Sequence, residues 1–136
     1  MRRLCSFLAV AVAVVLAGCG FDVQSPDLFL LTRSGQGKAL TMLVNDGGTI
    51  RCDGGKAKPL SGPLLLQARD LAINLDEDAK SKLHIDSTAD SVFTFTIKLQ
   101  DGTIFFPDTA ATKHHELAPA ELFTVQAAQQ ACGLSG

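Results

Sequence analysis

Three adjacent residues form the one group in the chain that invites a metal-binding or acid-base function: His114, His115 and Glu116. Imidazole and carboxylate groups can bind zinc or transfer protons near neutral pH. Neighbouring side chains in an extended segment point to opposite sides, so a site that used both histidines would need an unusual turn. A catalytic zinc also needs three protein ligands on a rigid scaffold, and the H-E-x-x-H pattern is absent from the sequence. We therefore expect an exposed polar loop and no metal site, with a metal-binding or acid-base role as the alternative.

Two further residues, Cys52 and Cys132, offer thiol chemistry. They lack the C-x-x-C spacing that is typical of a zinc site. In a chain exported to an oxidising compartment, which the N-terminus described below predicts, such a pair is expected to form a disulfide. The two cysteines are 80 positions apart. A disulfide that closes a loop of this length would stabilise the fold by about 4 to 5 kcal/mol, because it lowers the entropy of the unfolded chain. The alternative is two separate buried thiols.

Other patterns that carry catalytic or ligand-binding chemistry are absent from the sequence. There is no G-x-S-x-G motif, and the paired glycines at residues 47–48 and 54–55 match neither phosphate-binding glycine pattern. The acidic run at residues 76–78 would point in different directions around a helix, which favours a solvated helix face over a metal site. The sequence thus predicts a protein that is not an enzyme and has no cofactor.

The N-terminal segment predicts where the protein is located. Arg2 and Arg3 precede an apolar run over residues 4–15, which is typical of a secretion signal. The run is shorter than the stretch of about 20 residues that a transmembrane helix needs. It leads directly into Leu16, Ala17, Gly18 and Cys19.

This ending resembles the lipobox of bacterial lipoproteins. The resemblance implies that residues 1–18 are a signal peptide cleaved after Gly18, and that Cys19 becomes a lipid-modified N-terminus. Two acyl chains, such as palmitate, would anchor the protein stably, at about 0.8 kcal/mol per buried methylene group. We expect a protein attached by lipid to the extracytoplasmic face of the cell membrane.

The composition limits the possible partners. The formal net charge of the whole chain is -2, and loss of Arg2 and Arg3 makes the mature protein more acidic. This charge argues against nucleic acid and against electrostatic attraction to anionic lipid. Trp and Tyr are absent, so Phe is the one aromatic residue available for interfaces. We expect no nucleic-acid partner and an envelope protein or a small ligand instead.

The remaining chain predicts a tether at residues 19–27 and a single globular domain at residues 28–136. Short apolar or alternating runs separated by Gly-containing turns are typical of hairpin strands. In the run at residues 91–99, apolar and polar residues alternate, which places four apolar residues on the buried side: Phe93, Phe95, Ile97 and Leu99. The strands are expected at residues 28–32, 39–44, 49–52, 91–99 and 104–106.

Two helices are predicted, with a polar loop at residues 108–118. In the first, over residues 64–83, apolar residues recur at helical spacing: Leu64, Ala68, Leu71, Ala72, Leu75 and Ala79. The second begins at Pro119 and ends at Cys132, and its predicted buried face holds Leu122, Val125, Ala128 and Cys132. The predicted fold is α+β, with a mostly antiparallel sheet of about five strands, two helices packed on one face, and one disulfide.

Residues 49–55, followed by Pro59, Pro63 and a helix, resemble the first-cysteine region of subtilisin-inhibitor-like proteins, which are secreted antiparallel sheets with two helices. The predicted helix lacks a second cysteine, so no disulfide brackets an inhibitory loop and no reactive-site residue is assigned. The resemblance supports the fold more than a function. The sequence predicts a membrane-anchored lipoprotein with a non-catalytic binding or envelope accessory domain. The alternatives are a cell-surface protease inhibitor and a small hydrolase or metal-binding protein that uses residues 114–116.

Overall fold

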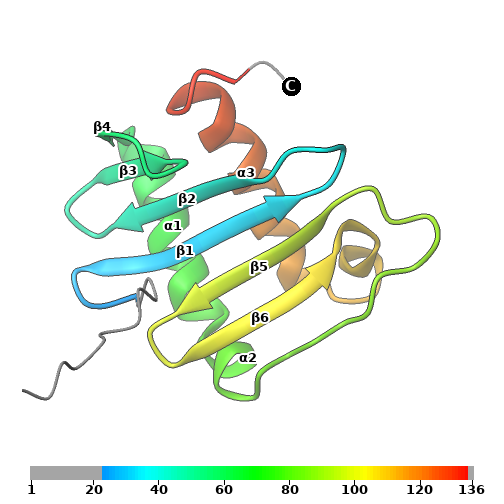
Figure 1. Ribbon diagram of the computed structural model, residues 1–136. Helices are drawn as coiled ribbons and strands as arrows, with labels where there is room; N and C mark the ends of the chain where they lie inside the picture. The colour runs from blue at the N-terminus through cyan, green and yellow to red at the C-terminus, as the bar shows by residue number, and fades with distance from the viewer. Residues whose placement is uncertain (1–22, 135–136) are drawn as a thin grey trace, which may run out of the picture.

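The computed structural model describes residues 23–134 (Figure 1). The predicted signal peptide at residues 1–18, the predicted lipidation site Cys19 and the first residues of the predicted tether lie outside the described residues. The described chain forms a six-stranded antiparallel sheet with helices packed against it, and one disulfide joins Cys52 to Cys132. The predicted α+β class and the predicted disulfide are therefore confirmed, with six strands in place of five.

The strand order in the sheet is β4-β3-β2-β1-β5-β6. The predicted hairpins β1-β2, β2-β3 and β5-β6 are confirmed, while the central pair β1-β5 joins strands that are distant in the sequence. The short edge strand β4 was not predicted, because its three exposed residues have no apolar alternation. The strands are β1 (Asp27–Ser34), β2 (Leu40–Asn45), β3 (Thr49–Cys52), β4 (Ala57–Pro59), β5 (Thr94–Leu99) and β6 (Gly102–Pro107).

The strand predicted at residues 91–99 begins later than expected. The backbone N–H groups of Val92 and Phe93 donate to the carboxylate of Asp108, at 3.2 and 3.1 Å, so this segment is held by a loop contact before β5 starts. From Phe95 onward the alternation is as predicted, since Phe95, Ile97 and Leu99 are buried.

The first predicted helix is two helices, α1 (Gly62–Asn74) and α2 (Asp76–Lys80). The hydroxyl of Ser61 accepts a hydrogen bond from the N–H of Leu64 and caps the start of α1. Leu75 adopts φ -96° and ψ 2°, outside the helical region, and this residue separates α1 from α2. Five of the six predicted core positions are buried, and Ala72 is half-buried.

The second predicted helix is α3 (Ala118–Gln130). Its predicted buried face is correct at Ala128 and Cys132 is half-buried, but the prediction is wrong at Leu122 and Val125. The side chains of Leu122 and Val125 are exposed, whereas Phe123 is fully buried and its ring centroid lies 5.6 Å from that of Phe29. Apolar residues occur on both sides of this helix, so helical spacing alone did not identify the side that contacts the sheet. The buried residues of α3 are Ala120, Phe123, Thr124, Ala127 and Ala128.

The segment predicted as a polar loop at residues 108–118 instead forms two short 3-10 helices, η1 (Asp108–Thr112) and η2 (His115–Leu117). Ala110 of η1 and Leu117 of η2 are buried. These two apolar residues had no periodic pattern around them, which is why the sequence indicated a loop.

The core lies between the sheet and the helices. In Figure 1, α1 and α3 run side by side behind the sheet, and none of the described segments covers the face turned toward the viewer. The predicted tether is partly packed on the domain, because Val23 is buried and the N–H of Asp46 donates to the carbonyl of Pro26 at 2.9 Å. Among residues 23–134, the helices are too short or too polar to cross a membrane.

Candidate functional site

The predicted histidine group lies at the start of η2. His114 Nδ1 is 3.2 Å from Glu116 Oε1, while His115 and Glu116 are exposed. The pKa of Glu116 is lowered, first by a hydrogen bond from the backbone N–H of Glu116 and then by the hydrogen bond with the side chain of His114. Burial and then the charge of Glu116 raise the pKa of the nearby Asp78. Within residues 23–134, no group of three or more His, Cys, Asp or Glu side chains is arranged to hold a metal ion.

A shallow cleft of about 390 Å³ lies beside this group, between residues 85–90 and η1. Thr88 lines the cleft, and its hydroxyl contacts the carboxylate of Asp90, the hydroxyl of Ser91 at 3.1 Å and that of Thr109 at 3.5 Å. His114 also lines the cleft. The hydroxyls of Thr88 and Ser91 both contact that of Thr109, which links the loop to η1.

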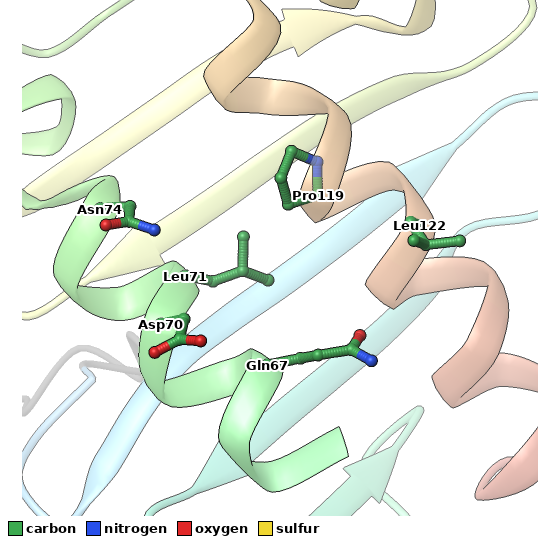
Figure 2. Close-up of a pocket in the computed structure, with 6 residues that line it drawn as sticks. All are labelled: Gln67, Asp70, Leu71, Asn74, Pro119 and Leu122. Atoms are coloured by element: carbon green, nitrogen blue, oxygen red, sulfur yellow. The ribbon is translucent and has the colours of Figure 1, made fainter. Parts of the chain in front are cut away.

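A second concave region, of about 240 Å³, is a groove between α1 and α3 on the side of the helices away from the sheet (Figure 2). Figure 2 shows Gln67 and Leu71 reaching from α1 toward α3, where Pro119 and Leu122 line the other side. Leu71 is nearly fully buried, so the groove has an apolar floor. The six lining residues are Gln67, Asp70, Leu71, Asn74, Pro119 and Leu122.

Exposed aliphatic side chains gather on the two helices that form this groove. Leu66 and Ile73 on α1 are 60% and 73% exposed, and Leu122 and Val125 on α3 are 55% and 45% exposed. Residues 66 and 73 are seven positions apart, so they lie on one face of α1, opposite the buried Leu64 and Ala68. Grouped exposed apolar residues indicate an interaction site more strongly than single ones do. We call Leu66, Asp70, Ile73, Leu122 and Val125 the outer helical surface.

The charges around the outer helical surface are mainly acidic. Asp70 lies on α1 between Leu66 and Ile73 and lines the groove. Arg69, the one basic residue of α1, binds Asp46, with 2.7 Å between Nε and Oδ1. Lys80, the one basic residue of α2, contacts two carboxylates of the same helix, at 2.6 and 3.4 Å. The basic residues of α1 and α2 are therefore already paired with acids.

Glu121 on α3 has a partly buried carboxyl group with a raised pKa. Its Oε1 atom is buried, and no described residue hydrogen-bonds to it. Burial and then the charge of Asp108 raise the pKa of Glu121 to about 7. Below that pH the carboxyl group is neutral, which avoids the repulsion that two ionised carboxylates would have there.

The structure places each residue of the predicted sites that it describes. Cys52 and Cys132 are joined as predicted, Cys19 lies outside the described residues, and residues 114–116 form a surface polar group. The outer helical surface was not predicted, although the positions of Leu66 and Ile73, opposite the buried residues of α1, are a sequence signal for it. Comparisons with protein-family models, with curated proteins and with solved structures found no match.

Proposed function

We propose that this protein is a membrane-anchored extracytoplasmic lipoprotein whose folded domain is a non-catalytic binding or envelope accessory module. The lipobox-like residues 16–19 support lipid attachment at Cys19. The disulfide between Cys52 and Cys132 supports a location outside the cytoplasm, because such bonds persist in oxidising compartments.

The observation that carries the binding role is the group of exposed aliphatic side chains on α1 and α3. Leaving Leu66, Ile73 and Leu122 in water costs free energy that a partner would recover by covering them. An apolar group beside a groove is typical of surfaces that bind other proteins.

The anchoring part is tested by intact-mass measurement of protein purified from membranes. The expected mass exceeds that of the polypeptide of residues 19–136 by the mass of the attached acyl groups. A control protein, exported through an ordinary signal peptide and with Cys19→Ala, should be released from the membrane with its disulfide formed. An unmodified mass, or an N-terminus elsewhere, would contradict lipidation.

The binding part is tested separately, in intact cells. A photoactivatable crosslinking residue is placed at exposed positions on the helices, on the open sheet face and near η2, one position per variant. We expect crosslinking to one dominant envelope protein from at least one of these surfaces. Absence of any crosslinked partner, with a labelled and membrane-bound protein, would contradict the binding role.

A further inference from the structure

We propose that the outer helical surface binds an amphipathic helix of a partner protein, and that this helix carries Lys or Arg within a stripe of aliphatic side chains. This inference rests on the proposed binding function and adds the binding surface and the chemistry of the partner.

The shape of the surface fits a helix. Two packed helices leave a groove between them, and the apolar floor of this groove is formed by Leu71. Leu122 lines its α3 side, and Leu66 and Ile73 lie next to the groove on the outward face of α1. An amphipathic helix bound in such a groove presents apolar residues three and four positions apart, which can contact both rims. A polar loop would leave these aliphatic side chains in water.

The charge of the surface selects a basic partner. Asp70 lies between the two exposed aliphatic residues of α1 and lines the groove. The nearest basic residue in the sequence, Arg69, binds Asp46 and does not neutralise Asp70. α2 follows directly and carries three acidic residues against one basic residue, Lys80, so it adds net negative charge near the end of α1. A Lys or Arg in the bound helix would thus gain a carboxylate partner as it is buried.

The acidic charges of the outer helical surface disfavour two other binding partners, a second copy of this chain and an anionic membrane. A symmetric dimer through this surface would place two copies of Asp70 in one interface with no basic residue of α1 free to pair with them, and uncompensated charge in an interface costs free energy. An anionic membrane surface would repel these groups as well. The charge distribution therefore favours a basic protein segment over a second copy or a lipid surface.

The open face of the sheet is the other broad uncovered surface in the described chain, and its side chains fit a partner less well. A row of threonines crosses its centre, where Thr32 pairs with Thr41 on one side and with Thr96 on the other. Threonine is well solvated on an open sheet face. The nearby Leu30 and Leu43 are half-buried, because neighbouring strands shield them. Of the six strongly exposed large aliphatic side chains of the described residues, four are on α1 and α3, and the other two, Val92 and Leu134, lie outside helices and strands.

The test uses the full-length, membrane-bound protein in intact cells. A photoactivatable residue replaces Leu122 in one variant and Leu66 in another, and Thr103 on the open sheet face is the control position, since all three side chains are exposed. The crosslinked peptides are then identified by mass spectrometry. We expect crosslinks from residues 66 and 122 to one segment that has a helical apolar stripe and Lys or Arg, and at least about tenfold fewer from residue 103.

A charge exchange then tests the ion pair. A synthetic peptide of the crosslinked segment should bind the purified domain, and Asp70→Lys should weaken this binding about tenfold or more. A peptide with Glu in place of its basic residue should recover binding to the Asp70→Lys variant. Asp101→Lys, the same charge change in the exposed β5-β6 turn, is the matched control and should leave binding unchanged.

The results of these experiments distinguish the proposed binding function from the proposed binding surface and its basic helical partner. Crosslinks from residue 103 but not from residues 66 and 122 would overturn this inference and leave the binding function standing. Crosslinks between two copies of this chain, to lipid alone, or to a segment without basic residues would also overturn it. The absence of crosslinks from every position would contradict both proposals.

Discussion

Cys52, the last residue of β3, is bonded to Cys132, just beyond the end of α3, and the two Cα atoms are 5.8 Å apart. The bond spans 80 positions of the sequence. It joins the β3-β4 edge of the sheet to the helical layer.

Removal of this bond should destabilise the domain strongly. For the double variant Cys52→Ala and Cys132→Ala we expect a free energy of unfolding lower by about 4 kcal/mol, because the unfolded chain regains the entropy of the open loop. Urea unfolding of both proteins measures the difference. Reduction of the unsubstituted protein should have a similar effect, and stability unchanged by either treatment would contradict the prediction.

Gly102 is expected to be intolerant of any side chain. An added Cβ would lie 1.9 Å from the carbonyl oxygen of Ala79 on α2, so Gly102→Ala must displace that helix. We expect a loss of stability of about 2 to 4 kcal/mol, measured by urea unfolding. Gly62→Ala is the matched control, since nothing lies within 4 Å of its added Cβ, and its stability should be nearly unchanged. Equal effects of the two substitutions would contradict the observed packing of α2 on β6.

The orientation of α3 is tested by two adjacent residues. Phe123→Ala should reduce the free energy of unfolding by about 3 to 5 kcal/mol, because its ring is fully buried against Phe29. Leu122→Ala should change it by less than about 0.5 kcal/mol, since that side chain is exposed. Thermal unfolding of the two variants distinguishes the two faces. The opposite order would mean that the buried face predicted from the sequence was right.

The raised pKa of Glu121 predicts a pH dependence of stability. The unfolded chain loses this proton near pH 4.5, whereas the folded protein keeps it until about pH 7. Stability should therefore fall as the pH rises from about 4.5 to 7 and then level off. Glu121→Gln removes the ionisation, so this variant should be more stable than the unsubstituted protein at pH 8. We expect a gain of about 1 kcal/mol, discounted because part of the carboxyl group remains in contact with solvent.

Urea unfolding at pH 5 and pH 8 measures this effect, with Glu116→Gln as the control. Glu116 is exposed and its pKa is lowered, so its substitution should give no gain at pH 8. A Glu121→Gln variant with the same pH dependence as the unsubstituted protein would contradict the assignment.

Several features of the candidate sites follow from residue type and count. Cys52 and Cys132 were predicted to pair because no other cysteine of the expected mature chain is free to bond, once Cys19 is assigned to lipid. Residue type and count did not predict the outer helical surface. Leu122 and Val125 have the same apolar character as Phe123 and Ala127, so residue type alone does not distinguish the buried side of α3 from the exposed one.

At Gly102 the local sequence predicted the turn but did not predict why glycine is needed there. Asp101 and Gly102 correctly predicted the β5-β6 hairpin, because turn chemistry involves only neighbouring residues. The need for glycine at this position comes from the carbonyl oxygen of Ala79, which is distant in the sequence.

The sequence by itself determined the α+β class, the main hairpins, the first helical face and the disulfide, since each depends on local periodicity, turn residues or a count of cysteines. Only the tertiary structure decided the central pairing of β1 with β5, the break at Leu75, the side of α3 that meets the sheet and the exposure of Leu122. These features depend on contacts between elements that are distant along the chain. The energy of such contacts comes from how the assembled surfaces fit together, and a single segment of sequence does not contain that information.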